Sequence, residues 1–424
     1  MQKHIRQLLK EGKKVYHFGF GQAPFPLLHC AAEGLREHAE ETAYLATQGI
    51  AELRKGISRF HSRHDDLDID PDNIVVAPGS KELIFLLMSI FNGDILILSP
   101  AWTTYQPQSV LTHHRHFLID SCAQRGWRVT PEAIEKVVNE NDLKQNRLMI
   151  MCNPDNPTGV CYTKAQLHRI SEVCRKHNII VLSDEIYART KFDGKHESIG
   201  KFYPEGTIIS TGLSKWASAG GWRLGYHIFP AELKSLRDAV KSAATHSYSC
   251  APAPIQFAAA KMFNHTEHCD DYISHTRRIY EAVAEHTYTE LTSIGVKCVK
   301  PEGSFYMFPD FEILRPALNR RGIRTGAQMC AALLDEAAVT LIAGGPAFLR
   351  PVEELTTRLC FVFFNGKVAL EESHRIGLDK PLPRDFVKEF CVDLYEGIQA
   401  LKDWALKQLQ DAPLQENCKE NGDA

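Results

Sequence analysis

The sequence predicts an α/β protein, in which a mostly parallel β-sheet flanked by helices forms a large domain beside a smaller α+β domain. Short apolar segments recur between residues 74 and 210 without alternating polar positions, which is typical of strands covered on both faces. Helical patterns, such as residues 164–177, separate most of these segments, and this alternation is typical of a parallel sheet. The expected strands are Ile74–Val76, Ile95–Leu98, Leu148–Met151, Ile179–Leu182 and Ile208–Ser210.

Chain length and a change of pattern predict two domains and a tail. The chain has 424 residues, which suffices for two or three domains of ~100–200 residues each. We expect residues 41–296 to form the large domain, and residues 1–40 and 297–410 to form the small domain, where short strands alternate with helices. The polar residues 411–424 are expected to be disordered. The small-domain strands expected here are Phe305–Phe308 and Leu359–Val362.

Composition excludes several classes of partner. A net charge of −3 gives no basis for binding nucleic acid or an anionic membrane. No apolar run approaches the ~18–20 residues of a membrane span, and the first residues lack the apolar core of a secretory signal. A transit peptide is left open by the basic N-terminus, although Glu11 and the lack of serines argue against one. The twelve cysteines occur without a Cys-x-x-Cys pair, which indicates reduced thiols and a cytoplasmic protein.

The segment that follows the last expected strand carries a lysine and an arginine suited to one cofactor. Lys215 stands in Ser-Thr-Gly-Leu-Ser-Lys, and Arg223 follows eight positions later among glycines. A lysine can form a Schiff base with an aldehyde, and an arginine can hold a phosphate with two donors. Pyridoxal phosphate carries both groups, so the pair favours that cofactor. Most lysines are solvated surface charges, so Lys215 and Arg223 alone do not establish the cofactor. The residues that follow the other strands have to support it.

Two earlier strand ends carry groups that fit the same cofactor. After Val76, backbone N–H groups near Gly79 and the Ser80 hydroxyl could hold a phosphate at the positive end of a helix. A plain turn capped by Ser80 is the alternative interpretation. Trp102 follows the next strand and could lie against a cofactor ring, or be an ordinary core aromatic.

Three further residues complete the candidate site. The Asn-Pro turns after Met151 could aim Asn156 at a ring oxygen, or serve only as turns. Asp184 ends an apolar strand, where a buried carboxylate needs a cation such as a protonated pyridine nitrogen; the alternative is an exposed helix cap. Arg358 begins an expected strand and could hold a substrate carboxylate bidentately. Ligands bind beyond the carboxyl ends of parallel strands, where most of these groups stand.

Together these segments resemble the class I/II aminotransferases, which are pyridoxal phosphate enzymes of fold type I, over roughly residues 15–400. The most specific motifs are Asn156-Pro157-Thr158-Gly159, Asp184-Glu185-Ile186-Tyr187 and Ser214-Lys215 followed by Gly221-Trp222-Arg223-Leu224-Gly225. The resemblance implies an enzyme that moves an amino group from an L-amino acid to a 2-oxo acid such as 2-oxoglutarate. It also implies a cytoplasmic homodimer with its sites at the interface.

The resemblance assigns roles residue by residue. Lys215 would form the Schiff base and move the proton, and Asp184 would pair with the pyridinium nitrogen. Asn156 and Tyr187 would bond the ring hydroxyl, with Tyr187 counted among the catalytic residues. The remaining expected cofactor contacts are Gly79, Ser80, Lys81, Trp102, Ser214, Arg223 and Tyr44, the last reaching the partner subunit's phosphate. The expected substrate contacts are Gly21, Asn156 and Arg358.

The sequence departs from the family pattern near the phosphate and near the substrate. Gly212 stands where many members have a phosphate-binding serine. Gly21-Gln22-Ala23-Pro24-Phe25 replaces the commoner Gly-Glu-Pro-Asp-Phe, and the segment before this loop is short. Lys81 matches a lysine that, in the bacterial-type aspartate aminotransferases, helps bind the distal carboxylate, so an acidic substrate such as aspartate or glutamate is expected. An exposed Lys81 that meets only solvent is the alternative.

Other classes of function fit the sequence less well. Gly19-x-Gly21 after an expected strand resembles a dinucleotide loop, but Pro24 replaces the third glycine. The histidines from His113 to His116 could bind a metal, but neighbouring histidines in a charged stretch are usually solvated, and no metal site is predicted. A lyase or oxidase on the same fold would keep the cofactor and change the outcome. An inactive interaction protein is disfavoured because the lysine, the aspartate and both arginines are present.

Overall fold

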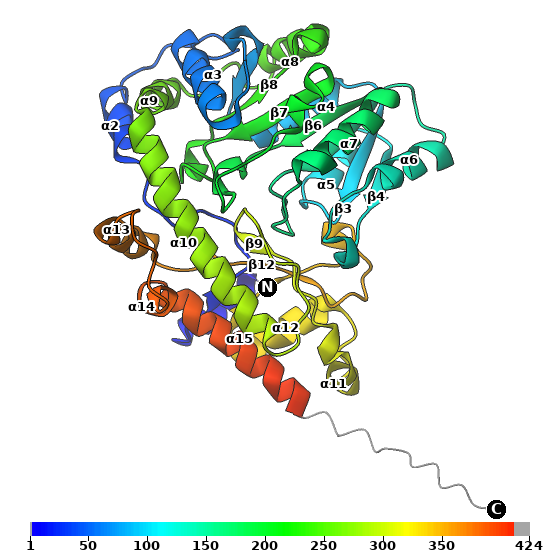
Figure 1. Cartoon of the computed structure of the whole chain (residues 1–424), viewed down its shortest axis with the longest axis vertical. Coiled ribbons are helices and arrows are strands. Elements are labelled where there is room, and N and C mark those ends of the chain that lie inside the picture. Colours follow the sequence, from blue (N-terminus) through cyan, green and yellow to red (C-terminus); the bar gives the residue numbers. More distant parts are fainter. Residues whose placement is uncertain (1, 411–424) are drawn as a thin grey trace, which may run out of the picture.

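A seven-stranded, mostly parallel sheet forms the centre of the computed structural model, which describes residues 2–410 (Figure 1). Its strand order is β2-β8-β7-β6-β5-β3-β4, and only β8 runs antiparallel to its neighbours. The parallel strands therefore bring their carboxyl ends to one edge. The strands are β2 (Ile74–Ala77), β3 (Asp94–Ser99), β4 (His116–Asp120), β5 (Arg147–Cys152), β6 (Ile179–Asp184), β7 (Thr207–Gly212) and β8 (Gly225–Ile228).

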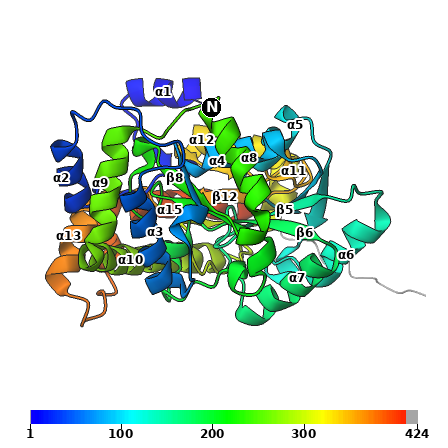
Figure 2. The same cartoon turned by 90° about the horizontal axis from the view of Figure 1, so that it is seen from above.

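Helices cover both faces of this sheet (Figure 2). Alternate residues of one strand, such as Leu148 and Met149, enter different apolar clusters, one with α4 and α8 and the other with α6 and α7. This arrangement explains why the strands are apolar at every position. The helices around the sheet are α3 (Ala51–Asp65), α4 (Ser80–Ile90), α5 (Tyr105–Leu111), α6 (Pro131–Glu140), α7 (Lys164–Lys176), α8 (Lys234–Thr245) and α9 (Ala253–Asn264).

The α/β class with a mostly parallel central sheet is confirmed, and each of the five expected strands corresponds to an observed one. The expected helix over residues 164–177 is α7. Two strands of this sheet were not predicted. β4 lies at the sheet edge, where four of its five residues are not fully buried and the apolar signal is weak. β8 is four residues long and begins at a glycine within the Gly-Trp-Arg motif.

The rest of the chain forms two small sheets and a second group of helices. β1 (Tyr16–His17) pairs in parallel with β10 (Val339–Thr340), so the N-terminal segment joins residues far along the chain. The other sheet has the order β11-β12-β9 and is antiparallel. Arg358 is the second residue of β12, not the first as expected. The strands of this sheet are β9 (Tyr306–Met307), β11 (Ile342–Ala343) and β12 (Thr357–Cys360).

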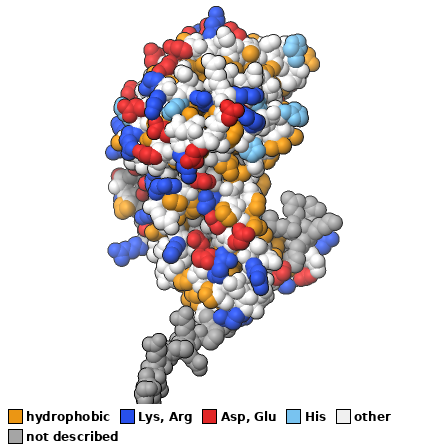
Figure 3. All heavy atoms as spheres, turned by 90° about the vertical axis from the view of Figure 1, so that its right-hand side faces the viewer, with side chains coloured by type: hydrophobic (Ala, Val, Ile, Leu, Met, Phe, Trp, Pro, Cys, Tyr) orange, Lys and Arg blue, Asp and Glu red, His pale blue; other side chains and the backbone are white. Residues whose placement is uncertain are grey.

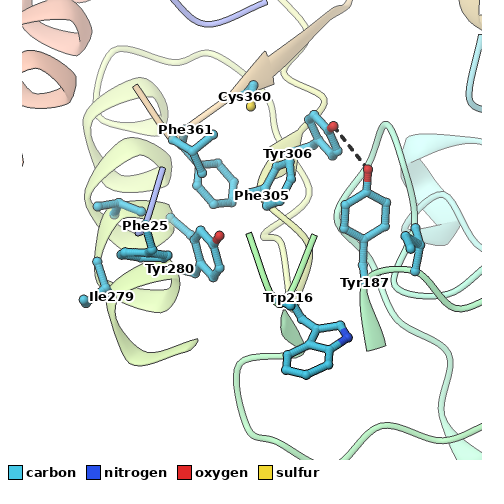
Figure 4. Close-up of a cluster of buried hydrophobic side chains, with 14 of the residues drawn as sticks. Phe25, Tyr187, Trp216, Ile279, Tyr280, Phe305, Tyr306, Cys360 and Phe361 are labelled. Carbon is cyan, nitrogen blue, oxygen red and sulfur yellow. Dashed lines mark hydrogen bonds between the residues drawn. The ribbon is translucent and has the colours of Figure 1, made fainter. Parts of the chain in front are cut away.

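The long helix α10 (Thr266–Thr292) links the two groups of elements, running from the helices beside the large sheet toward α15 (Figure 1). Aromatic side chains fill the space beside it: Phe25 packs edge-on against Tyr280 at 5.1 Å, and Phe305 lies between Tyr280 and Tyr187 (Figure 4). The remaining helices are α1 (Gln2–Lys10), α2 (His29–Glu37), α11 (Arg315–Arg320), α12 (Gly326–Ala337), α13 (Gly366–Ile376), α14 (Phe386–Phe390) and α15 (Val392–Gln410).

The helices, the surface charge and the cysteines of residues 2–410 bear on the compositional expectations. Across residues 2–410, every helix is too short or too polar to cross a bilayer. Lys and Arg side chains are interspersed with Asp and Glu on the face shown in Figure 3. The cysteines of the described chain are free thiols. The division at residues 40/41 and 296/297 stays a prediction, and the expected disordered tail, residues 411–424, lies outside the described residues.

Candidate active site

A cavity of about 600 Å³ opens at the carboxyl edge of the large sheet, between it and the small sheets. It gathers most of the residues singled out in the sequence, and they come from segments up to 339 positions apart, as the hydrogen bond from Arg358 to the Gly19 carbonyl illustrates. The lining residues are Gly19, Phe20, Gly21, Ser80, Lys81, Trp102, Tyr105, Cys152, Asn156, Asp184, Ile186, Tyr187, Ser214, Lys215, Arg223, Tyr306, Ile342 and Arg358.

Lys215 lies three residues beyond the end of β7 and points into this cavity. Its Nζ donates a hydrogen bond to the Gly21 carbonyl oxygen at 2.8 Å, and the ammonium lies over the Phe305 ring at 5.5 Å. Burial lowers the pKa of Lys215 to about 8, because the charged form loses its hydration. About a tenth of the amine is therefore neutral at pH 7, far more than for an ordinary lysine, and the neutral amine is the form that attacks a carbonyl carbon.

Asp184 is the last residue of β6 and is buried in the cavity wall. The Tyr105 hydroxyl donates to its Oδ2 at 2.7 Å, and the Ile186 amide donates to its Oδ1 at 3.3 Å. Burial raises the pKa of Asp184 to about 6 despite these two donors. Such a carboxylate is stabilised by a cation placed against it, and it faces a cavity that can supply one. The alternative of an exposed helix cap is wrong.

The first turn of α4 and the β7–β8 connection form a tight anion cradle. α4 begins at Ser80 with Gly79 as its N-cap, and no side chain caps the free N–H groups. Gly79 has φ +96°, and a Cβ there would overlap the Arg223 guanidinium. Arg223 is held by bonds from its Nη1 to the Gly220 carbonyl at 2.9 Å and to Ser214 Oγ at 3.4 Å. A helix N-terminus beside a guanidinium is suited to a phosphate.

A second arginine stands on the other side of the cavity. Arg358 Nη1 donates to Asn156 Oδ1 at 3.2 Å, and Nη2 donates to the Gly19 carbonyl at 3.0 Å. Its buried Nε has no partner among the described residues, and the guanidinium lies over the Tyr306 ring at 4.6 Å. An arginine with an unused donor in a cavity is ready to bind a carboxylate.

Asn156 and Tyr187 meet beside Lys215. The Asn156 amide donates to the Tyr187 hydroxyl at 3.4 Å, and that hydroxyl donates to the Tyr306 hydroxyl at 3.2 Å (Figure 4). Burial raises the pKa of Tyr187 well above its usual range, so it stays protonated near neutral pH. The pair therefore offers an amide and a phenol at one point of the cavity wall.

Trp102 and Lys81 lie together at the cavity wall. The Lys81 ammonium sits over the Trp102 ring at 4.9 Å, and Trp102 packs edge-on against Tyr105 at 5.3 Å. Burial, and to a lesser extent the Arg223 charge, lowers the pKa of Lys81. Lys81 therefore does not only meet solvent: it faces the cavity as a cation beside another cation.

Some residues discussed in the sequence analysis do not line the cavity. Tyr44 does not line the cavity, and 90% of its surface is exposed. Gly212 lies so close to β8 that a Cβ would stand 2.7 Å from the Leu224 carbonyl oxygen, so a serine there would push the strands apart. The histidines from His113 to His116 do not converge: His114 bonds the Met88 and Gly93 carbonyls, whereas His116 contacts Gln106 and Ser109.

Two tyrosines of the site were not anticipated. Tyr105 follows Trp102 in the predicted segment, but nothing in the sequence pairs it with Asp184, 79 positions away. Tyr306 lies in an apolar run expected to be a strand, and its contacts with Tyr187 and Arg358 arise only on folding. At Gly21, a Cβ would overlap the Tyr306 hydroxyl, which explains the glycine.

Comparison with known proteins assigns the chain to a family. The model of the family described as aminotransferase class I and II matches residues 13–362, and the chain belongs to this family. It is 31% identical over 351 residues to an aspartate aminotransferase of Geobacillus stearothermophilus, covering 80% of this chain and 86% of that one. It is 29% identical over 384 residues to a probable aspartate/prephenate aminotransferase of Aquifex aeolicus, covering 87% of this chain and 94% of that one.

Solved structures of aminotransferases have the same fold as this chain. A Thermus thermophilus aspartate aminotransferase double mutant has a TM-score of 0.79 at 21% identity, covering 95% of this chain and 94% of that one, which shows the fold. A Thermotoga maritima aspartate aminotransferase has a TM-score of 0.75 at 26% identity, covering 95% of both chains. The protein is a pyridoxal phosphate-dependent aminotransferase acting on amino acid and oxo acid substrates. The lyase and oxidase alternatives receive no support from these relatives.

The cavity fits this cofactor. Its phosphate suits the cradle of Ser80 and Arg223, its aldehyde suits the Lys215 amine, and its protonated ring nitrogen suits the buried Asp184 carboxylate. In the structure, the hydrogen-bond partners of Arg223, Lys215 and Asp184 are neutral groups, so no partner neutralises their charges. The donor set therefore agrees with the family assignment on independent grounds.

Proposed function

We propose that the enzyme transfers the amino group of an acidic L-amino acid, aspartate or glutamate, to a 2-oxo acid such as 2-oxoglutarate. The supporting observation is the charge of the cavity, whose lining carries four basic side chains and a single carboxylate, Asp184. The partners of these basic groups are neutral, such as the Gly21 carbonyl for Lys215 and the Gly220 carbonyl for Arg223. A cavity with this imbalance favours ligands that bring several negative charges.

The anions can be assigned to the cations one by one. Arg223 with Ser80 and Ser214 takes the cofactor phosphate, and Arg358 takes the α-carboxylate of the substrate. Lys81 then remains for a third anion, the distal carboxylate of an acidic substrate. The partner of Lys81 in the structure is the face of Trp102, a weaker contact than a carboxylate would give.

The chain's own residues divide the work of the reaction. The cofactor, when bound, supplies an electron sink that stabilises negative charge at the substrate Cα. Asp184 keeps the ring nitrogen protonated, and Tyr105 orients that carboxylate through its hydroxyl. The Lys215 Nζ, with its lowered pKa, accepts and returns the proton of the substrate Cα. Asn156 and Tyr187 would hold the ring oxygen of the cofactor, and Trp102 would lie against its ring.

The protein is further proposed to be a cytoplasmic homodimer. Tyr44 is exposed over 90% of its surface and is therefore accessible to a partner chain, and its segment resembles the family segment that reaches the partner subunit's phosphate. In this assembly it reaches the phosphate bound in the partner's site. Gly79 contributes to the same phosphate site only by making room for Arg223.

The half-reaction tests the proposed function. Purified protein loaded with pyridoxal phosphate is mixed with a single L-amino acid and no oxo acid, and its absorption spectrum is recorded. Aspartate or glutamate should abolish the visible band, produce the near-ultraviolet band of the aminated cofactor, and release one oxo acid per site. Lys215→Ala should bind the cofactor without this conversion. Conversion by aromatic amino acids with both acidic ones inert would contradict the acidic substrate.

The role of Lys81 has a separate test. Lys81→Met should raise KM for aspartate by roughly 10–100-fold, the value of one charged hydrogen bond, and change KM for an aromatic amino acid far less. Lys164→Met, at an exposed position of α7, is the matched control and should change neither. Equal increases for both donors would assign Lys81 to the cofactor phosphate instead of the distal carboxylate.

A further inference from the structure

A cluster of three metal-ligating side chains lies outside the active site, where α10 meets α13. Asp271 and His275 stand one turn apart on α10, and His374 faces them from α13. Asp271 Oδ1 lies 3.6 Å from His275 Nε2, and Asp271 Oδ2 lies 3.7 Å from His374 Nδ1. One ligand atom from each residue can be chosen so that all lie within 4.8 Å of one another.

His275 is the buried member of this cluster and is held in one orientation. Its side chain is 3% exposed, and its Nδ1 lies 2.7 Å from the Ser373 hydroxyl. Ser373 Oγ also accepts a hydrogen bond from Arg278 Nε at 2.8 Å, and its second lone pair can accept the Nδ1 proton. With Nδ1 as the donor to Ser373, the Nε2 lone pair faces Asp271, whose nearest oxygen is beyond hydrogen-bond distance.

The two imidazoles of the cluster also face each other closely. The His275 and His374 rings lie 3.9 Å apart between centroids, an arrangement that the shared carboxylate alone does not require.

The cluster borders a cavity that leaves a coordination position open. A hollow of about 440 Å³ lies between the segment that leads into α2, the start of α10, and α13. Asp271 and His374 line it, whereas His275 lies behind them. A water molecule or a further side chain can therefore reach an ion held by the three residues. The other polar residues around the hollow are His29, Glu33, His265 and His268.

We propose that Asp271, His275 and His374 bind a divalent transition-metal ion of the zinc class. Two imidazoles and one carboxylate suit such ions, whereas calcium and magnesium prefer oxygen ligands throughout. Metal bonds of ~2.0–2.1 Å place tetrahedral ligands about 3.3 Å apart. The three ligand atoms lie within 4.8 Å of one another, so they have to close by at most about 1.5 Å. Asp271 and His374 are partly exposed and can move, while His275 provides the fixed point.

The Ser373 hydroxyl is a positioning group for this site. Ligating histidines commonly donate their other ring N–H to an outer partner, which fixes the tautomer, and losing such a partner typically costs about 10–100-fold in metal affinity. Ser373 has this relation to His275, with Arg278 anchoring it in turn. The ion would cross-link α10 and α13, so its binding should raise the unfolding temperature.

Zinc binding to the cofactor-loaded enzyme, freed of metals with a chelator, tests the proposal. Equilibrium dialysis with Zn²⁺ should give one tight site per chain in the wild type. His374→Ala should weaken that site by more than about 100-fold, beyond the loss of an outer partner, and Ser373→Ala should weaken it by roughly 10–100-fold. The rise in unfolding temperature with Zn²⁺ should be absent from His374→Ala.

His168→Ala is the matched control. His168 and Glu172 form a similar pair one turn apart on α7, with 3.7 Å between Nδ1 and Oε2, but they belong to no three-residue cluster in the described chain. This variant should bind Zn²⁺ as the wild type does. If cysteines or the cofactor held the zinc, every variant would bind Zn²⁺ with the affinity of the wild type. Equal affinity in the wild type and His374→Ala would overturn the proposal.

Discussion

Asp184 and Lys215 are each costly to bury in the cofactor-free protein. Burial raises the pKa of Asp184 to about 6 and lowers the pKa of Lys215 to about 8, because it destabilises the charged form of each group. The Tyr105 hydroxyl supports Asp184, but no donor removes the penalty. Sites that must bind a charged ligand commonly retain such destabilised groups. Stability and cofactor binding should therefore respond in opposite directions at these positions.

Asp184→Asn should stabilise the cofactor-free protein by roughly 1–3 kcal/mol at neutral pH and weaken cofactor binding. Because the folded pKa is raised from 3.8 to about 6, the native state holds the proton more tightly, and wild-type stability falls as pH rises through this window. The advantage of the variant should therefore grow between about pH 4 and 6 and stay constant above. Urea unfolding at several pH values measures it.

Asp120→Asn is the control for this prediction, because Asp120 also ends a strand of the large sheet, β4, but is exposed. It should leave both stability and cofactor affinity nearly unchanged. An Asp184→Asn protein that is less stable than the wild type at every pH would show that the carboxylate stabilises the empty site.

Sequence motifs identified the charged residues of the site but not all their partners. Lys215, Asp184 and Arg223 stand in local motifs, so order and spacing sufficed to select them, and the cavity gathers them. Tyr105 and Tyr306 become neighbours of these groups only through the packing of distant segments, for which a single sequence carries no signal.

At the scale of elements, the N-terminus of α4 depends on how closely the backbone approaches Arg223. Gly79 has φ +96°, a conformation that L side chains rarely adopt, and a Cβ there would displace the guanidinium. Gly225 on β8 packs in turn against the backbone of Ser80. The cradle therefore requires glycine on both sides of the turn, and its geometry should be sensitive to a single methyl group.

Gly79→Ala should weaken pyridoxal phosphate binding by at least about tenfold. The strained φ costs roughly 1–3 kcal/mol, and the displaced Arg223 loses its position beside the helix N-terminus. Gly221→Ala is the matched control, since Gly221 lies in the same motif and a Cβ there would meet nothing within 4 Å. Dialysis and fluorescence quenching measure the cofactor dissociation constant. Equal affinity in both variants would mean that the turn can relax.

Elements with strong apolar runs were predictable, and short or exposed ones were not. β3 and β5 are buried at nearly every position, so their sequences alone specify central strands. β4 is an edge strand with half-exposed residues, and β8 owes its place to pairing with both β2 and β7. The pairing of β1 with β10, 323 positions apart at Tyr16 and Val339, likewise reflects tertiary packing.

At the scale of the whole molecule, the proposed cofactor residues line the chain's own cavity except Gly79, which lies directly behind Arg223, and Tyr44. Tyr44 is exposed, and the sequence around it resembles the family segment that reaches into the partner subunit. A two-fold dimer would bring each Tyr44 to the phosphate cradle of the other chain. The site would then be complete only in the dimer, and a defect in one chain could be corrected by the other.

Mixing two inactive variants tests this shared site. In Lys215→Ala each chain keeps Tyr44, whereas in Tyr44→Ala each chain keeps Lys215, so a mixed dimer contains one site with both residues intact. Random pairing after partial unfolding and refolding of an equal mixture should recover about a quarter of wild-type activity, because half the dimers are mixed and each has one good site. The two variants refolded separately provide the baseline. Activity equal to the sum of the separate variants would place Tyr44 outside the partner's site.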